Sequence, residues 1–263
     1  MTEQFIDFHS DHGVATVTMN RPDVHNAFNE QVIAQMTAAF EKAGADAAVR
    51  AVVLRGNGKS FSAGGDMNWM KRSATYSFEQ NVADAMGLAK LLKTINTLPK
   101  PTIALVQGNA FGGGVGLTAC CDIAIAEEGT RFCLSEVRIG LIPSIIAPYV
   151  IAAIGERQAR RYFMTAERFD ARVAERLGLV HEVCAQGGLD AAKDKILAAL
   201  SDGAPSAQAR GKKVILEIAK KPIDDAVIKF TAEQIAEARA SDEGKEGLSA
   251  FLNKSEPNWR KKA

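Results

Sequence analysis

The 263-residue sequence lacks the excess of positive charge that proteins need to bind a nucleic-acid backbone. Lys and Arg together number 32 and Asp and Glu 31, so the formal net charge is +1. Binding to DNA or RNA depends on basic side chains that neutralise phosphates. The basic ending "WRKKA" is short and is typical of a solvated terminus. The charge balance therefore argues against a nucleic-acid partner.

The sequence also lacks long apolar runs and paired cysteine motifs. No run approaches the ~20 apolar residues of a membrane span, and "MTEQFIDFHSD" has neither the basic start nor the apolar stretch of a signal peptide. The four cysteines, two of them adjacent in "LTACCDIAIA", show no metal-binding spacing. They are typical of small buried side chains in a reducing compartment. We therefore expect a cytoplasmic protein without a metal site.

Three catalytic or nucleotide-binding motifs are absent. "GNGKS" at 56–60 would need a glycine five residues before Gly58 to form a phosphate loop, and Val53 stands there. "GGGVGL" has Leu117 at the third glycine position of the dinucleotide fingerprint. No serine lies in a Gly-x-Ser-x-Gly elbow, and the four histidines form no ligand pattern. We therefore expect no nucleotide cofactor.

The hydrophobic pattern predicts an α/β fold. Alternating residues at 14–19, preceded by "FIDFH", predict two short strands, and helical spacing predicts helices from Asn29 to Gly44 and over 77–97. Short apolar runs predict further strands at 51–54, 102–106 and 122–126. Strands that alternate with helices indicate mainly parallel pairing. After about residue 190 only helical patterns remain.

Three motifs follow these strands directly. "SFSAGGDM" (60–67) follows the strand at 51–54, and "GNAFGGGVGL" (108–117) follows the strand at 102–106. "LSEVRIGLIP" (134–143) comes shortly after the strand at 122–126. Ligands of open α/β sheets bind at the carboxyl ends of the parallel strands. The order of these motifs therefore predicts one site built from two glycine-rich turns and a carboxylate.

The glycines allow two explanations. A glycine inside a helix costs roughly 1 kcal/mol relative to alanine, so "GGGVG" needs either close backbone packing or bare N–H groups at a helix start. The turn at Ala63–Gly64 and a helix that begins near Gly113 can each offer one N–H to the same oxygen. Two such donors would stabilise an enolate or a tetrahedral species, each by roughly 3 kcal/mol. Tight turns that simply require glycine are the alternative for either motif alone.

Four segments carry a resemblance to a known family. They are "HNAFN" (25–29), "VVLRGNGKSFSAGGD" (52–66), "KPTIALVQGNAFGGGVGL" (100–117) and "LSEVRIGLIP" (134–143). In this order they resemble the crotonase superfamily, the enoyl-CoA hydratases and isomerases. The resemblance implies an α/β, crotonase-like spiral of ββα units over residues 1–190 and a carboxyl-terminal helical trimerisation region over residues 191–263. It also implies an acyl-CoA substrate and a homo-trimer or hexamer.

The resemblance assigns roles to individual residues. It places the thioester oxygen between the N–H groups of Ala63 and Gly113 and makes Glu136 the catalytic carboxylate. Gly116 stands where hydratases of this family carry a second glutamate. A carboxylate at a helix start after Ser135 is the alternative explanation of Glu136. The implied substrate and CoA contacts are His25, Ala27, Ala63, Gly64, Gly65, Asp66, Met67, Gly113, Gly116, Phe251 and Lys254, the last two often from a neighbouring subunit.

A single glutamate leaves two reactions open. Glu136 could transfer a proton from water during hydration of a 2-enoyl-CoA, or move a proton between carbons as a Δ3–Δ2 isomerase does. "CLSEVRIGLIPSIIAPYV" and "EGKEGLSAFLNKSEPNW" resemble bacterial methylglutaconyl-CoA and carboxygeranoyl-CoA hydratases, which favours a lyase of leucine or acyclic-terpene breakdown. The second carboxylate of such a substrate would need a cation, with Arg138, Lys71 and Arg72 as candidates. A non-catalytic or RNA-associated member of the superfamily is a further alternative, which the near-neutral charge disfavours.

Overall fold

The computed structural model describes residues 3–260, which form two compact units. One unit contains the chain as far as Leu98 together with Thr102–Asp194, and the other contains Pro99–Pro101 and the chain from Lys195 onward. The strands are β1 (Ile6–Asp11), β2 (Val14–Met19), β3 (Ala51–Gly56), β4 (Thr102–Val106), β5 (Asn109–Phe111), β6 (Ile123–Glu127), β7 (Arg131–Cys133), β8 (Phe169–Asp170) and β9 (Glu182–Cys184). The α-helices are α1 (Glu30–Ala45), α2 (Met67–Ser73), α3 (Phe78–Thr97), α4 (Gly113–Cys120), α5 (Ala147–Thr165), α6 (Ala171–Leu177), α7 (Leu189–Asp202), α8 (Pro205–Ile218), α9 (Asp225–Ala240) and α10 (Asp242–Leu252). The 3-10 turns are η1 (Pro22–Val24), η2 (Glu136–Ile139) and η3 (Asn258–Arg260).

A six-stranded sheet runs through the first unit. Its order is β1-β2-β3-β4-β6-β9, and every pair is parallel except the β1–β2 hairpin. All residues of β4 are buried, as expected for a strand covered on both faces. The prediction of a mainly parallel α/β fold is confirmed. Parallel pairing brings the carboxyl ends of β3, β4 and β6 to one edge of the sheet.

A second, three-stranded sheet has the order β5-β7-β8. The sequence did not predict it, because strands of two or three residues are too short to show a period. The loop after β3 runs beside β5: the Ser62 N–H donates to the Asn109 carbonyl at 3.0 Å, and the Phe111 N–H donates to the Ser62 carbonyl at 2.9 Å. These bonds attach the loop after β3 to the segment that leads into α4.

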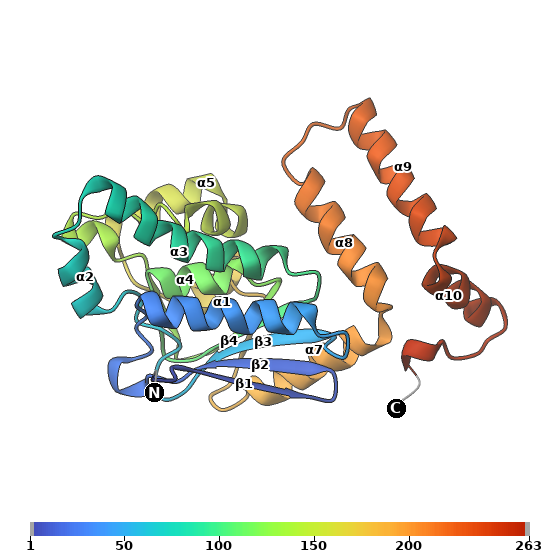
Figure 1. Cartoon of the computed structure of the whole chain (residues 1–263), viewed down its shortest axis with the longest axis horizontal. Coiled ribbons are helices and arrows are strands. Elements are labelled where there is room, and N and C mark those ends of the chain that lie inside the picture. Colours follow the sequence, from blue (N-terminus) through green and yellow to red (C-terminus); the bar gives the residue numbers. More distant parts are fainter. Residues whose placement is uncertain (1–2, 261–263) are drawn as a thin grey trace. The chain divides into compact units, whose positions relative to one another are not determined.

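Two helices of the first unit, α1 and α3, begin at residues whose side chains cap the helix. The Asn29 side chain accepts hydrogen bonds from two N–H groups at the start of α1, and Ser77 and Gln80 form a capping box on α3. The apolar face of α1 packs against β1, β2 and α3 (Figure 1). The helices predicted from Asn29 and over 77–97 are confirmed within two residues at their ends.

Helices α8, α9 and α10 belong to the second unit (Figure 1), where the sequence had predicted helical segments. Large apolar side chains of this unit are exposed, among them Ile223 (88%), Phe251 (80%) and Leu252 (77%). Within residues 3–260, no helix combines the length and apolar character needed to cross a bilayer.

Candidate active site

In the turn after β3, the amide of Gly65 is unbonded among the described residues. The Ala63 N–H already donates to the His25 carbonyl at 2.9 Å, so the amide of Ala63 is not available to a ligand. Within residues 3–260 the N–H of Gly65 donates to no acceptor. This geometry contradicts Ala63 as the first donor: in the same motif, the amide that is left unbonded is that of Gly65, two positions further along.

Two hydrogen bonds flank the Gly65 amide and fix its peptide plane. The Phe28 N–H donates to the Gly64 carbonyl at 2.9 Å, and the Asp66 N–H donates to the Phe28 carbonyl at 3.0 Å. Together they form an isolated parallel bridge between Phe28 and Gly65. The bridge uses the groups on either side of Gly65 and leaves the N–H of Gly65 unbonded.

Another unbonded amide lies at the start of α4. Gly113 is the first residue of this eight-residue helix, and its N–H donates to no acceptor in the described part of the chain. The first amides of a helix have no partner within the helix and carry the positive end of its dipole. A Cβ placed on Gly64 would lie 3.5 Å from the Gly113 nitrogen. The two glycine-rich loops are therefore in contact.

The glycines of α4 are also required by packing. A Cβ on Gly113 would lie 2.2 Å from Cζ of Phe28, and one on Gly114 would lie 2.8 Å from the Ser62 carbonyl oxygen. Gly112 has a φ of 51°, in the left-handed region that favours glycine. Close packing alone therefore explains these residue types. The chemical explanation depends on the unbonded amides, and not on the glycines themselves.

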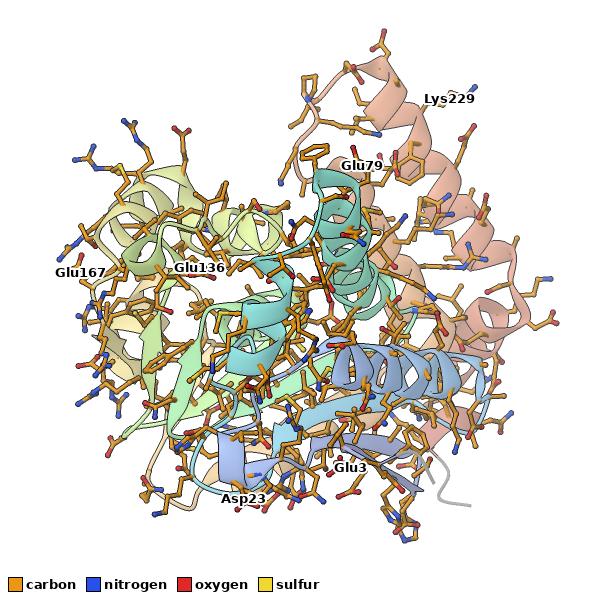
Figure 2. The ribbon with its side chains drawn as sticks, turned by 60° about the vertical axis from the view of Figure 1, so that its left-hand side comes forward. Glu3, Asp23, Glu79, Glu136, Glu167 and Lys229 are labelled. Atoms are coloured by element: carbon orange, nitrogen blue, oxygen red, sulfur yellow. The ribbon has the colours of Figure 1, made fainter. Side chains whose placement is uncertain are left out.

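Glu136 lies beside the start of α4, in the segment that leads into α5 (Figure 2). A Cβ on Gly112 would lie 3.1 Å from Oε1 of Glu136, and Oε2 is buried with no hydrogen-bond partner among the described residues. Burial raises the pKa of the Glu136 carboxyl, and a hydrogen bond from its own backbone N–H opposes this less strongly. A buried, unpaired carboxyl beside free amides is typical of an acid–base group.

The space next to Gly116 is filled by Ile146. A Cβ on Gly116 would lie 2.2 Å from Cγ2 and 2.8 Å from Cβ of Ile146, whose side chain is 3% exposed. Gly112 precedes α4 as its N-cap, and Gly116 is the fourth residue of the helix. Glu136 lies against Gly112 and Ile146 lies against Gly116, so no carboxylate from position 116 joins Glu136.

This contact gives a testable prediction for stability. We expect Gly116→Ala to lower the Tm by about 3–10 °C, because overpacking a core costs about 1–3 kcal/mol. Ile146→Gly removes both clashing atoms and leaves Cα at 3.8 Å, an ordinary contact. Thermal unfolding of the single and double variants should show that Ile146→Gly relieves the Gly116→Ala defect. Ile146→Val keeps Cγ2 and should give no relief. Strictly additive changes in Tm would contradict the contact.

Other predicted contacts are placed as follows. His25 is exposed, with Nδ1 3.1 Å from the Ser60 hydroxyl, and Met67 is 69% exposed at the start of α2. Ala27 is buried, and its carbonyl accepts a hydrogen bond from Arg21. The first unit therefore gathers His25, Ala27, Gly64, Gly65, Asp66 and Met67 around one turn. Phe251 and Lys254 lie in the second unit.

Two of the three side chains predicted as partners of an acyl carboxylate already form hydrogen bonds within the protein. Arg72 donates to the Glu30 carboxylate at 2.7 Å, and Arg138 donates to the Ala166 carbonyl at 2.6 Å. Lys71 is exposed on α2. Arg138 is the candidate nearest to Glu136 in the chain, two residues further on.

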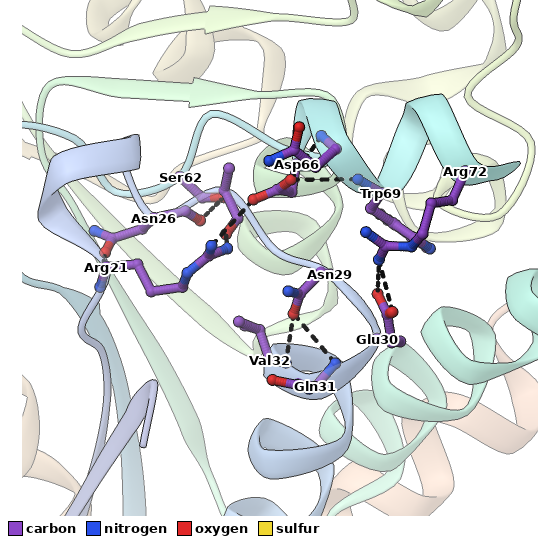
Figure 3. Close-up of polar contacts among 12 residues, drawn as sticks. Arg21, Asn26, Asn29, Glu30, Gln31, Val32, Ser62, Asp66, Trp69 and Arg72 are labelled. Carbon is purple, nitrogen blue, oxygen red and sulfur yellow. Dashed lines mark hydrogen bonds and ion pairs between the residues drawn. The ribbon is translucent and has the colours of Figure 1, made fainter. Parts of the chain in front are cut away.

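The sequence did not identify Arg21, which pairs with Asp66 inside the turn (Figure 3). Asp66 was predicted as a CoA contact, yet its carboxylate bonds to Arg21 and to the first N–H groups of α2. A single arginine in a loop forms no pattern with a residue 45 positions away. The only local signal is Pro22, which starts a short helical turn.

Comparisons with known proteins agree with this site and fold. The Enoyl-CoA hydratase/isomerase family matches residues 9–262. The crystal structure of an enoyl-CoA hydratase from Shewanella pealeana is 45% identical, with a TM-score of 0.95 over 97% of this chain and 96% of that one. Pseudomonas aeruginosa AtuE is 36% identical, with a TM-score of 0.94 over 98% and 100%. A trans-2-decenoyl-[acyl-carrier-protein] isomerase of Streptococcus mutans is 32% identical over 74% of this chain and 75% of its own.

The family match covers nearly the whole chain, and the structural neighbours share its fold at TM-scores above 0.9. The resemblance drawn from the four sequence segments is thus confirmed. The chain belongs to the enoyl-CoA hydratase/isomerase family of the crotonase superfamily and is an enzyme of the enoyl-CoA hydratase type.

Proposed function

We propose that this enzyme adds water across the α,β-double bond of an enoyl-CoA, with Glu136 as its acid–base group. The observation that carries the proposal is the buried Oε2 of Glu136, which has no partner among the described residues. Glu136 lies beside the loop with the unbonded Gly113 amide, and that loop contacts the turn with the unbonded Gly65 amide. The thioester oxygen would accept hydrogen bonds from the Gly65 and Gly113 N–H groups. Donors of this kind stabilise charge that develops in the transition state.

The reaction then follows in two proton transfers. The Glu136 carboxylate takes a proton from water while the water oxygen bonds to the β-carbon, and the π electrons move to the thioester oxygen as an enolate. The enolate collapses as the protonated Glu136 returns a proton to the α-carbon. The raised pKa of Glu136 brings its acid and base forms closer in energy, which suits a group that must be both. Water is added without net oxidation or reduction, so the proposed reaction requires no redox cofactor.

Double-bond migration from the 3-position to the 2-position is the second candidate. The observation that favours it is Ile146, which fills the space beside Gly116 and leaves Glu136 without a second carboxylate on that face of α4. A proton shuttle between C2 and C4 needs only one carboxylate and passes through an enolate (dienolate) held by the same two amides.

For the acyl group we propose a branched, methylglutaconyl-type chain with a second carboxylate, as in leucine degradation. The support is the likeness of the segments around Glu136 and at the carboxyl terminus to hydratases of that type. Arg138 would hold the second carboxylate, since its guanidinium has further N–H groups besides the one bonded to Ala166. We also propose a trimer or hexamer, supported by exposed apolar side chains such as Phe251. A cytoplasmic location is consistent with cysteines that form no disulfide in the described part of the chain.

Incubation in D2O separates the two reactions. We expect a 2-enoyl-CoA to be converted to the 3-hydroxyacyl-CoA with one deuterium at the α-carbon, because Glu136 exchanges its proton with solvent or receives one from D2O. Mass spectrometry of products from 2-enoyl-CoA and 3-enoyl-CoA substrates measures hydration and migration separately. Migration without hydration would replace the hydratase proposal with the isomerase. Absence of any turnover would favour the non-catalytic alternative.

A further inference from the structure

We infer that Arg21 is a positioning residue, which holds the Gly65 amide in place by clamping the two chain segments that meet at the Phe28–Gly65 bridge. The inference rests on the proposed function, because it gives Gly65 the role of an oxyanion donor. Arg21 touches neither of the two amides, so it would act on catalysis only through the geometry of the turn.

The guanidinium of Arg21 reaches both segments at once (Figure 3). One terminal nitrogen (Nη2) lies 3.1 Å from Oδ2 of Asp66, and the other (Nη1) donates to the Ala27 carbonyl at 2.6 Å. Ala27 immediately precedes Phe28, and Asp66 immediately follows Gly65. The two contacts of Arg21 therefore lie next to the bridge on each of its two segments.

The environment of Arg21 makes this clamp rigid. The side chains of Arg21 and Asp66 are only 17% and 10% exposed, so water competes weakly for the pair. The guanidinium carbon also lies 4.8 Å from the centre of the Phe5 ring, within the range of a cation–π contact. A planar guanidinium with fixed donors suits two acceptors at once, which a lysine ammonium cannot match.

The other carboxylate oxygen of Asp66 is also bonded within the protein, at the start of α2. Its Oδ1 accepts hydrogen bonds from the N–H groups of Asn68 at 2.8 Å and Trp69 at 3.3 Å, which caps α2. Burial acts to raise the pKa of Asp66, but these hydrogen bonds and Arg21 outweigh it and lower the pKa, so the carboxylate is ionised at neutral pH. Both oxygens are bonded within the protein. Asp66 therefore links α2 to the turn instead of facing a ligand.

Loss of the clamp should affect turnover more than binding. An amide displaced by a fraction of an ångström still lies near the thioester, but it no longer meets the oxygen where negative charge develops. We expect Arg21→Met to lower kcat about tenfold with KM within about threefold. Arg21→Lys, which keeps the charge but not the fork, should fall between Arg21→Met and the wild type. Asp66→Asn keeps a good helix cap and should lower kcat without melting α2.

The matched control is Arg55→Met. Arg55 pairs with Asp190 at 3.2 Å in the same unit, and within residues 3–260 its side chain makes no hydrogen bond or ion pair to the turn. We expect kcat of the Arg55→Met variant to stay within about twofold of the wild type, because exposed ion pairs have small effects. Rates are measured at temperatures well below the Tm of every variant, so that a change in folded fraction does not enter kcat.

A double-mutant cycle with Gly65→Pro tests whether Arg21 affects kcat through the Gly65 amide. If Arg21 acts through the Gly65 amide, Arg21→Met should lower kcat by less than about twofold once that amide is gone. An equal loss in both backgrounds, or a lower Tm with unchanged kcat for Arg21→Met and Asp66→Asn, would overturn the inference and leave the proposed function intact. A wild-type protein that turns over no enoyl-CoA would refute both.

Discussion

Glu136→Gln should lower kcat at least about a hundredfold, because glutamine has nearly the same shape but cannot accept and return a proton. Acyl-CoA affinity should change little, since the two amides that would hold the thioester come from other residues. Steady-state rates and calorimetric binding of a substrate or product measure the two quantities separately. Glu128→Gln is the control: Glu128 is an exposed carboxylate paired with Arg172 at 2.7 Å, and its loss should leave kcat within about twofold.

The pH profile gives an independent test of the same carboxyl. Burial raises the pKa of Glu136, so the carboxylate that must take a proton from water is populated only above an elevated pKa. We expect kcat/KM of the wild type to fall with decreasing pH through a midpoint above the usual range for glutamate. The residual activity of Glu136→Gln should lack this midpoint. Near-normal turnover of Glu136→Gln, or an unchanged acid limb, would assign the proton transfer to another group.

Strands β1 to β4 and β6 and helices α1 and α3 were predictable because their apolar residues recur over four or more positions. β4 is buried throughout, and α1 presents its apolar residues on one face, so both leave a clear pattern in the sequence. The sheet formed by β5, β7 and β8 left none, since no strand in it exceeds three residues. Its existence depends on backbone bonds between segments that lie far apart in the chain.

The site was predictable as a set of motifs but not as a set of atoms. The order of the motifs located the turn, α4 and Glu136, yet it could not tell which amide of the turn is already bonded. That depends on the His25 carbonyl, which takes the N–H of Ala63. The sequence shows that position 116 is glycine where related hydratases carry a glutamate. It does not show that Ile146, 30 positions further on, fills the space beside Gly116. Both facts are tertiary contacts that no local pattern contains.

Gly65→Pro should lower kcat by about a hundredfold to a thousandfold, because proline has no N–H and removal of one oxyanion donor typically costs that much. The Phe28–Gly65 bridge uses the Gly64 carbonyl and the Asp66 amide, so proline at position 65 removes no hydrogen bond that the described residues make. Gly65, unlike Gly64, does not have a positive φ, a region that proline cannot reach. Circular dichroism and the Tm establish that the variant is folded before its rate is measured.

Gly65→Ala is the matched control, since it adds a side chain and keeps the amide. Its Cβ would lie 3.7 Å from the ring of Trp69 and 3.8 Å from Met70, which are ordinary contacts, so kcat should stay within about threefold. The comparison isolates one hydrogen atom on one backbone nitrogen. If folded Gly65→Pro worked as well as Gly65→Ala, the thioester oxygen would have to be held elsewhere. Because the Ala63 amide is already bonded to the His25 carbonyl, the thioester oxygen would then depend on the unbonded amide at the start of α4.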